Sequence, residues 1–381
     1  MAFCRAPALI QVCMLDRAGY QSVAEKTFKD LIVHPPEKED AWRYCIRVTS
    51  GTTGGQLIGT AFRYQPEAIK RFSGFHAPIL CLGASATRLA YNIQARHGLP
   101  EESRSLALDG TDLTDDLTRV ISEYKPDSIF GFVSFAVRVA EYIDAETASG
   151  IQALVLGGEC ITAEMDTFLR EKFPQARLTM RYISLEVGRI SEESCGYQAR
   201  NHYHPYKGVR VEIDSPDEDG VGEVLVSPGT RPDVVRYRTG DVGRMKKGPC
   251  ACGASETIEL LGRNGRDYVK LAGALVRRDE CDRVAKEIAL FDDYRVEASQ
   301  VITGGKLQGK LVLRVFRKDG HYSPMLQAQI EREFSKKLYL TPSRTLAELV
   351  HTGEFSPLSV EFSHTPFPLK HKEIKIVRTD I

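Results

Sequence analysis

The chain has 381 residues, 42% of them hydrophobic and 27% charged, which is ordinary for a globular protein with a sizeable core and leaves room for two domains. Lysine plus arginine and aspartate plus glutamate both number 51, so the formal net charge is +0. This balance argues against a general binder of nucleic acids or membrane surfaces, whose binding face is usually basic.

The cysteines and the N-terminus bear on the cellular compartment. Nine cysteines, an odd number spread over a long chain, fit a reducing compartment better than a disulfide framework. No apolar run is long enough to cross a bilayer. Asp16 and Arg17 cut short the apolar patch near the N-terminus, which lacks a signal-peptide layout. We therefore expect a cytoplasmic protein.

Helices alternate with short strands in the first half of the chain. The periodicity predicts helices over 18–33, 67–72, 113–124, 136–143 and 162–173, the last with Thr162 as its N-cap. It predicts strands over 44–48, 77–83, 128–132, 151–156 and 178–184. Such alternation is typical of an α/β domain with a parallel, helix-covered sheet.

Beyond Glu186 the pattern changes. Residues 208–214 and 222–227 alternate at period two around a polar turn, which predicts an antiparallel β hairpin appended to the α/β domain. From Arg277 onward we expect an α+β unit with helices 280–290 and 324–338 and strands 299–302, 310–315 and 358–362. Glycine and charge concentrate near Gly262 to Asp267, so the predicted domains are 1–262 and 263–381.

A glycine-rich run, Thr49-Ser50-Gly51-Thr52-Thr53-Gly54-Gly55, directly follows the first predicted strand. Glycine allows positive φ and close approach to a ligand, and successive N–H and hydroxyl groups can then face a phosphate. No lysine follows the last glycine, so this is not the G-x-x-x-x-G-K-[ST] loop. On spacing alone, a plain surface loop is an equally good interpretation.

Four further motifs follow in a fixed order. They are Gly157-Gly158-Glu159, Tyr182-Ile183-Ser184-Leu185-Glu186, Tyr237-Arg238-Thr239-Gly240-Asp241, and Gly262-Arg263 with Lys270 and Gly273. Together with Thr49 to Gly54, this succession resembles the adenylate-forming superfamily of acyl-CoA synthetases. Within it, Cys250-Ala251-Cys252-Gly253 is similar to the phenylacetate–CoA ligase branch. The likeness runs from about Arg43 to the C-terminus; each motif is weak alone, and the ordered set is specific.

The resemblance implies a large α/β domain and a small C-terminal α+β lid that rotates between half-reactions about a hinge at Asn264 to Asp267. Such enzymes join a carboxylate to the α-phosphate of ATP, expel pyrophosphate and pass the acyl group to a thiol. Positioning and charge neutralisation carry most of this catalysis. The implied cofactors are ATP, Mg²⁺ and CoA, and the implied partners are a carboxylic acid and CoA or a carrier thiol, with a homodimer left open.

The resemblance also assigns roles to residues of the nucleotide site. The β- and γ-phosphates would be held by Thr49, Ser50, Gly51, Thr52, Thr53 and Gly54, and the adenine side would be lined by Gly157, Gly158 and Glu159. Tyr182 would pack on adenine, and Glu186 would hold Mg²⁺. Asp241 would bind the ribose hydroxyls, and Arg263 would support the ribose or phosphate. The plainer alternatives are a sheet aromatic for Tyr182, a solvated acid for Glu186, a turn cap for Asp241 and a surface ion pair for Arg263.

The catalytic lysine of this superfamily lies in a mobile loop near the C-terminus, shortly after a proline. Lys372 fits that place best, although His371 stands where the family has glycine. Lys370 and Lys375 are alternatives, and a solvated basic tail is the plain interpretation. An ammonium suits the role because it reaches both carboxylate and phosphate oxygens.

Cys250 and Cys252 suggest a metal site within about residues 187–256. Because structural zinc normally takes four ligands, the pair needs partners. Cys195 and either His202 or His204 could complete a Cys₃His site tying the hairpin to the approach to the hinge. Reduced core or turn cysteines are the alternative.

Departures from the family pattern limit what can be transferred. The family has Tyr-Gly-x-Thr-Glu where this chain has Ile183 and Leu185, so Leu185 offers no hydroxyl to the α-phosphate and Ser184 would have to replace it. Compared with the family, the segment before Thr49 and the region 74–113 are shorter, and Gly265-Arg266 adds one residue at the predicted hinge. The resemblance implies that the first two of these regions shape the acyl pocket and much of the dimer surface, so an aryl acid is only what the family suggests.

The leading hypothesis is an ATP-dependent, AMP-forming acid–thiol ligase. An adenylyltransferase or an acyl-protein synthetase of the same branch is the nearest alternative. A nucleotide-binding regulatory or scaffold protein with weakened catalysis is the alternative from another class, favoured by Leu185 and the short pocket regions.

Overall fold

The computed structural model describes residues 44–48, 59–63, 79–82, 105–108, 115–184, 186–192, 194–195, 197, 199–229, 234–246, 248–263, 268–367 and 376–380. The predicted helices 18–33 and 67–72, the loop Thr49 to Gly54, Leu185, the hinge Asn264 to Asp267 and the three tail lysines lie outside these residues. Within them, no helix is both long and apolar enough to span a membrane.

A five-stranded parallel sheet forms the centre of the N-terminal half, in the order β4-β3-β5-β6-β7. Its strands are β3 (Ile79–Leu82), β4 (Ser105–Leu108), β5 (Ser128–Phe132), β6 (Ala153–Gly157) and β7 (Arg177–Arg181), and its helices are α4 (Asp115–Tyr124), α5 (Val133–Tyr142), α6 (Ala145–Gly150) and α7 (Ala163–Lys172). The predicted α/β class is therefore confirmed, as is the N-cap Thr162, whose side chain accepts a hydrogen bond from the Met165 N–H. The predicted strand 178–184 is too long, because the chain leaves the sheet after Arg181.

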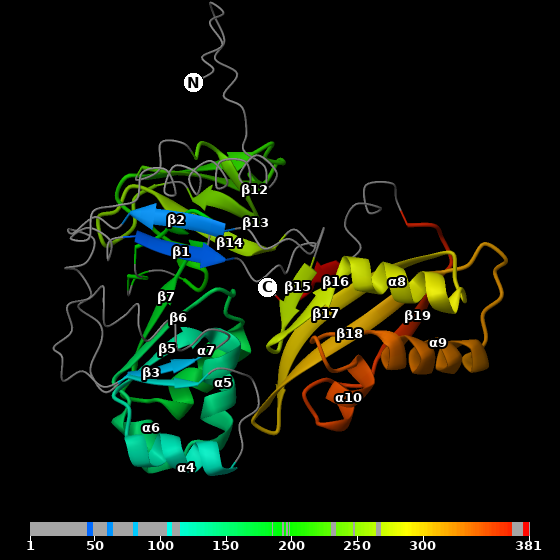
Figure 1. The fold of residues 1–381 in the computed structure, drawn as a ribbon. Helices are drawn as coiled ribbons and strands as arrows, with labels where there is room; N and C mark the ends of the chain where they lie inside the picture. Colours follow the sequence, from blue (N-terminus) through cyan, green and yellow to red (C-terminus); the bar gives the residue numbers. More distant parts are fainter. Residues whose placement is uncertain are drawn as a thin grey trace, which may run out of the picture.

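A second, antiparallel sheet carries the β hairpin, in the order β10-β14-β13-β12-β11 (Figure 1). It comprises β10 (His202–Tyr203), β11 (Val209–Asp214), β12 (Gly222–Pro228), β13 (Tyr237–Lys246) and β14 (Thr257–Arg263). Two short antiparallel strand pairs lie outside it: β1 (Tyr44–Val48) pairs with β2 (Gly59–Arg63), and β8 (Ile183–Ser184) pairs with β9 (Gly188–Arg189). The predicted hairpin is confirmed by the pairing of β11 with β12.

The C-terminal part is an α+β unit at the right of Figure 1. Its four-stranded sheet has the order β19-β18-β17-β20, with β17 (Asp293–Thr303) and β18 (Lys306–Phe316) as its long central hairpin. The other elements are β15 (Tyr268–Leu271), β16 (Ala274–Arg277), α8 (Arg278–Ile288), α9 (Pro324–Lys337), α10 (Leu346–His351), β19 (Ser359–Ser363) and β20 (Ile376–Arg378). The predicted α+β class of this part is confirmed, and β17 and β18 are longer than the predicted strands 299–302 and 310–315.

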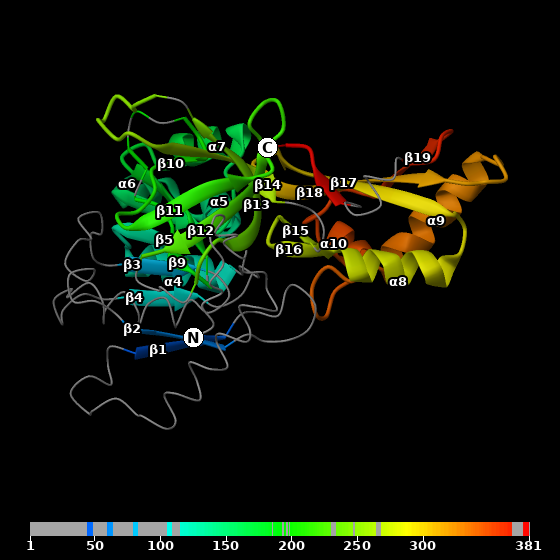
Figure 2. The ribbon, with the colours of Figure 1, turned by 90° about the horizontal axis from the view of Figure 1, so that it is seen from above.

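Helices α5 and α7 face the C-terminal sheet, and polar contacts cross between the two parts (Figures 1 and 2). Arg138 on α5 donates to the Ala272 carbonyl at 2.7 Å and pairs with Glu354 at 3.1 Å. Both side chains are largely buried, at 9% and 17% exposure. Arg344 holds the other oxygen of Glu354 at 2.5 Å. This network joins the two parts through charges that are largely shielded from water.

Candidate functional site

The Tyr182 side chain lies between the two sheets of the N-terminal half. Tyr182 follows β7, and its hydroxyl donates a 2.5 Å hydrogen bond to Oδ2 of Asp241 on β13. Burial, together with the nearby Asp241 carboxylate, raises the pKa of the Tyr182 phenol well above its ordinary value, so the hydroxyl stays protonated and donates. The sequence motifs that supply these two residues therefore meet in space.

Arg263 completes this group from the end of β14. Asp241 and Arg263 are register partners on neighbouring strands, and Arg263 Nε lies 3.9 Å from Asp241 Oδ1. The guanidinium also stacks 4.6 Å from the Tyr268 ring centre. Burial raises the pKa of the Asp241 carboxyl, although Arg263 and the Tyr182 hydroxyl act in the opposite direction. Asp241 lies inside a strand rather than in a turn, which argues against the turn-cap alternative.

Ser184 and Glu186 form a tight local structure between β8 and β9. The Ser184 hydroxyl donates to Glu186 Oε2 at 2.8 Å and accepts the backbone N–H groups of Glu186 and Val187, each at 3.2 Å. These bonds orient the Glu186 carboxylate, which is partly exposed. A carboxylate presented in this way offers the kind of oxygen ligand that Mg²⁺ prefers.

The segment Gly157-Gly158-Glu159 leaves the end of β6 and contacts the C-terminal part. Glu159 is almost fully buried, with 2% side-chain exposure, and pairs with Lys270 Nζ on β15 at 3.0 Å. Ser134 donates to the same Glu159 oxygen at 2.6 Å. The Lys270 ammonium lies 3.6 Å from the centre of the Phe132 ring, which adds a cation–π contact. The sequence singled out Glu159 and Lys270 separately, and their pairing was not predicted.

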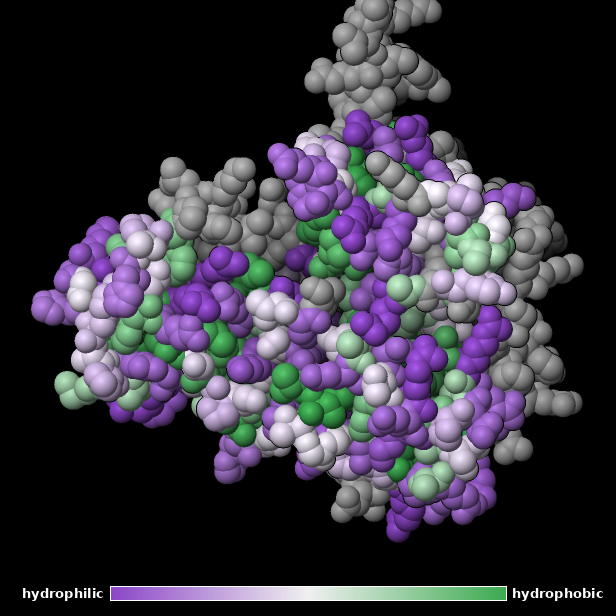
Figure 3. Space-filling view, turned by 180° about the vertical axis from the view of Figure 1, so that it is seen from behind, coloured by the Kyte–Doolittle hydropathy of each residue, from purple (hydrophilic) through white to green (hydrophobic). Residues whose placement is uncertain are grey.

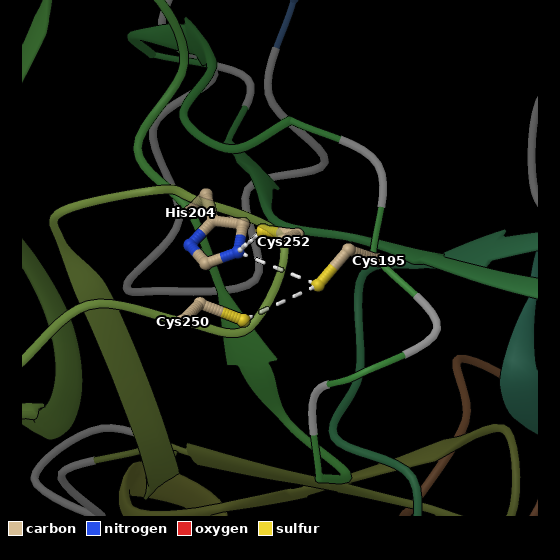
Figure 4. Close-up of side chains that lie close together, drawn as sticks. All are labelled: Cys195, His204, Cys250 and Cys252. Carbon is tan, nitrogen blue, oxygen red and sulfur yellow. Dashed lines mark hydrogen bonds between the residues drawn. The ribbon is translucent and has the colours of Figure 1, made fainter.

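Cys195, His204, Cys250 and Cys252 converge on one point (Figure 4), with all their donor atoms within 4.8 Å of one another. His204 Nε2 lies 3.4 Å from Cys195 Sγ and 3.1 Å from Cys252 Sγ, and the Cys195 and Cys250 sulfurs are 3.6 Å apart. Hydrogen bonding, led by the backbone N–H of Cys252, lowers the pKa of Cys250 to about 7.

The donor set fits a tetrahedral metal ion. Zinc with Zn–S bonds of about 2.3 Å holds neighbouring sulfurs roughly 3.8 Å apart, close to the spacing here. His204 Nδ1 contacts the Glu256 carbonyl at 2.7 Å, which leaves Nε2 directed at the sulfurs. His202 is not part of the cluster: its Nδ1 contacts the Arg200 carbonyl at 2.7 Å, and its Nε2 lies 3.8 Å from Glu259 Oε2. Of the two histidines left open by the sequence, only His204 faces the cysteines.

Two features of the site had no signal in the local sequence pattern. Tyr203 packs against Tyr182 with ring centres 6.0 Å apart, and it is 1% exposed. Asn201 bonds both backbone groups of Ile161, at 2.9 Å from the N–H and 3.0 Å from the carbonyl. Asn201 adopts a positive φ of 58°, which asparagine tolerates better than most residues, but a single Asn does not mark such a position in a sequence.

Known structures share this architecture. A 2-hydroxyisobutyryl-CoA ligase, solved with 2-HIB-AMP and CoA in the thioesterification state, matches at a TM-score of 0.58 and 14% identity over 96% of this chain and 80% of that one. A malonyl-CoA ligase in a ternary product complex with methylmalonyl-CoA and AMP matches at 0.50 and 18% identity, covering 85% of this chain and 71% of that one. No family model and no curated protein matches the sequence. The chain has the fold of the adenylate-forming acyl-CoA ligases.

Proposed function

Starting from this fold, we propose that the protein is an AMP-forming ligase. It would adenylate a carboxylic acid with ATP, releasing pyrophosphate, and then transfer the acyl group from AMP to the sulfur of CoA or another thiol, releasing AMP. The observation that carries the proposal is the group of Tyr182, Asp241 and Arg263. A flat ring, a carboxylate and a guanidinium side by side are the groups that would hold a base, a ribose and a phosphate. The subtype we propose is similar to phenylacetate–CoA ligases, with an aryl or related acid as substrate and a cytoplasmic location.

The proposal gives each of the candidate site residues a part in this reaction. Asp241 would accept hydrogen bonds from the ribose hydroxyls, and the Tyr182 ring would lie against adenine. Glu186, oriented by Ser184, would hold Mg²⁺, which would neutralise charge on the phosphates. Thr49 to Gly54 would contact the β- and γ-phosphates, and Lys372 would bring its ammonium to the reacting oxygens. Gly157 to Glu159 would line the adenine side.

We also propose that Cys195, His204, Cys250 and Cys252 hold a structural zinc ion. The support is the close approach of three sulfurs and one imidazole nitrogen, together with the carbonyl that fixes the histidine tautomer. Three thiolates and a histidine leave no open coordination position, which is the arrangement of a structural rather than a catalytic zinc site.

A nucleotide-binding protein without ligase activity is the second candidate, because the Ser184 hydroxyl is already engaged. It makes one bond to Glu186 and accepts two backbone N–H groups. With Leu185 in place of a hydroxyl-bearing residue, a contact to the α-phosphate would require Ser184 to give up these bonds. This candidate predicts ATP binding with no release of pyrophosphate.

Pyrophosphate release from ATP and Mg²⁺, measured with a broad panel of carboxylic acids, separates the two candidates. We expect release that depends on the acid, lost in Lys372→Ala although ATP still binds. Asp241→Ala should instead weaken ATP binding, while Asp219→Ala in the exposed β11–β12 turn serves as the matched control. ATP binding without release for any acid would favour the second candidate. Unchanged release in Lys372→Ala would move the role to Lys370 or Lys375.

A further inference from the structure

All four residues of the cysteine–histidine cluster lie on segments that continue into the proposed nucleotide site. Cys195 and His204 bound a short loop that follows Tyr182 and Glu186. Cys250 and Cys252 lie on the connection between β13 and β14, the strands that carry Asp241 and Arg263. A metal ion held by these four residues would therefore join the segments that surround the nucleotide.

The segment leading to Cys195 is bonded to the end of β7, from which Tyr182 follows. The N–H of Tyr182 donates to the Ser191 hydroxyl at 2.9 Å, and the N–H of Met180 donates to the Ser194 hydroxyl at 3.0 Å. In return, the backbone N–H groups of Ser191 and Ser194 donate to the carbonyls of Tyr182 and Met180, each at 3.1 Å. Cys195 is the next residue after Ser194, so its position is linked directly to the backbone of Tyr182.

The other end of the loop contacts the nucleotide site twice more. Asn201 forms its pair of hydrogen bonds with Ile161, two residues after Glu159. Tyr203 packs its ring on Tyr182, immediately before the cluster residue His204. Strand β10 has only two residues, His202 and Tyr203, so a short stretch of pairing with β14 holds Tyr203 in place for this aromatic contact.

We propose that the Cys195–His204 loop, when closed by a metal ion, positions Tyr182 and the segment after Glu159 for the nucleotide, with Asn201 and Tyr203 as positioning residues. A metal cross-link removes conformational freedom that the loop otherwise has, and the loop transmits this order through the contacts just described. The proposal rests on the nucleotide site of the proposed function. Linkage then requires the effect to be reciprocal: the metal raises nucleotide affinity, and the nucleotide raises metal affinity by the same factor.

The test measures AMP affinity by calorimetry on the full chain with zinc bound and after removal by a chelator. We expect zinc removal to weaken AMP binding about tenfold, within the usual range of such couplings. AMP should strengthen zinc binding by an equal factor in a competition with the chelator. A chelator-treated chain that stays folded and binds AMP as tightly as the zinc-bound one overturns the proposal.

Two substitutions test the loop while all four metal ligands remain. Asn201→Gly removes the side-chain bonds to Ile161 but keeps the positive φ, and Tyr203→Leu removes the ring that packs on Tyr182. Both should weaken AMP binding several-fold with zinc content unchanged. Ser215→Gly, at an exposed position with a φ of 45°, is the matched control and should change neither. Normal AMP affinity in both loop variants would contradict their positioning role.

Hydrogen exchange separates failure of this inference from failure of the proposed function. The amides of Met180, Tyr182 and Ile161 donate to the loop or to the segment before it, so we expect them to exchange faster once zinc is removed. This readout requires no nucleotide. If the zinc-bound chain does not bind AMP, the nucleotide site is wrong, and the exchange rates still decide whether the metal orders these segments; unchanged rates overturn the coupling.

Discussion

The Tyr182 hydroxyl donates a 2.5 Å hydrogen bond to Oδ2 of Asp241, 59 residues further along the chain. This bond connects the end of a strand in the parallel sheet with the middle of β13 in the antiparallel sheet. It holds an aromatic ring and a carboxylate in fixed relation at the junction of the two sheets. The Asp241 carboxylate is largely shielded from water, at 19% exposure, so losing a hydrogen-bond donor to it costs stability.

We predict that Tyr182→Phe destabilises the protein by about 1–3 kcal/mol, the usual cost of leaving a buried polar group unpaired. The ring remains, so the packing against Tyr203 is retained. Urea denaturation followed by circular dichroism measures the effect. Tyr197→Phe is the matched control: Tyr197 is 72% exposed, so this substitution should leave the stability of the protein unchanged. Equal stability of the two variants would mean that the bond to Asp241 contributes nothing.

The raised pKa of Asp241 predicts opposite pH trends for stability and binding. Since the carboxyl binds its proton more tightly in the folded protein, its contribution to stability is fully present below the unfolded pKa of about 3.8 and is lost as the pH rises through the folded value. Nucleotide binding needs the ionised form to accept the ribose hydroxyls, so AMP affinity should rise over the same interval. Calorimetric titration at stepped pH checks this.

The Asp241→Asn variant is the control for the pH dependence. It cannot ionise, so its AMP affinity should be low and flat over the interval in which the parent protein gains affinity. Asp219→Asn, in an exposed turn, should reproduce the parent curve. A pH dependence that survives in Asp241→Asn would assign the titration to another group.

The helices and strands of the parallel sheet and the β11–β12 hairpin could be predicted, because the periodicity of hydrophobic residues is a local property of the sequence. Helix α10 was missed because six residues are too few for a helical period, although Thr345 and Glu348 form a capping box that the sequence contains. The pairs Tyr182–Asp241 and Glu159–Lys270 join distant segments, so no local pattern could give them; only the resemblance suggested that the first pair share a site. The choice of His204 over His202 depends on where β10 ends, which sequence spacing does not determine.

The Arg138 network predicts that one buried guanidinium contributes to the contact between the two parts of the protein, beside the Glu159–Lys270 pair. Arg138→Met removes a hydrogen-bond donor to the Ala272 carbonyl and one of three side-chain partners of Glu354, the others being Arg344 and Thr352. We expect a loss of about 3 kcal/mol in stability, at the lower end for a broken buried pair because Arg344 remains. Arg119→Met is the matched control: its pair with Glu123 is 3.9 Å long with side chains 72% and 74% exposed, so the change should be within about 0.5 kcal/mol.

Thermal denaturation of both variants in parallel gives this comparison. Limited proteolysis adds a readout of the contact itself, because Arg138→Met should expose the α5 face to cleavage before the protein unfolds globally. An Arg138 variant as stable and as resistant as the Arg119 variant would show that the network does not hold the two parts together.

Gly158, in the segment that leaves β6, is predicted to tolerate no side chain. A Cβ there would lie 2.4 Å from Phe132 Cε1, and the φ of 76° disfavours any other residue. Phe132 lies against the Lys270 ammonium, so a displaced ring would also disturb the pair with Glu159. We expect Gly158→Ala to cost about 1–3 kcal/mol in stability, as overpacking does, and to weaken AMP binding. Gly150→Ala is the control, because nothing lies within 4 Å of its Cβ position.

Zinc content tests the metal proposal directly. Elemental analysis of protein expressed with sufficient zinc should give about one ion per chain, since four ligands make a closed site. Cys250→Ser should lose the metal, whereas Cys281→Ser, a change at a buried cysteine outside the cluster, should retain it. His202→Ala should also retain zinc and His204→Ala should lose it, because only His204 Nε2 faces the sulfurs. A full complement of zinc in His204→Ala, or none in the parent protein, would contradict the assigned ligand set.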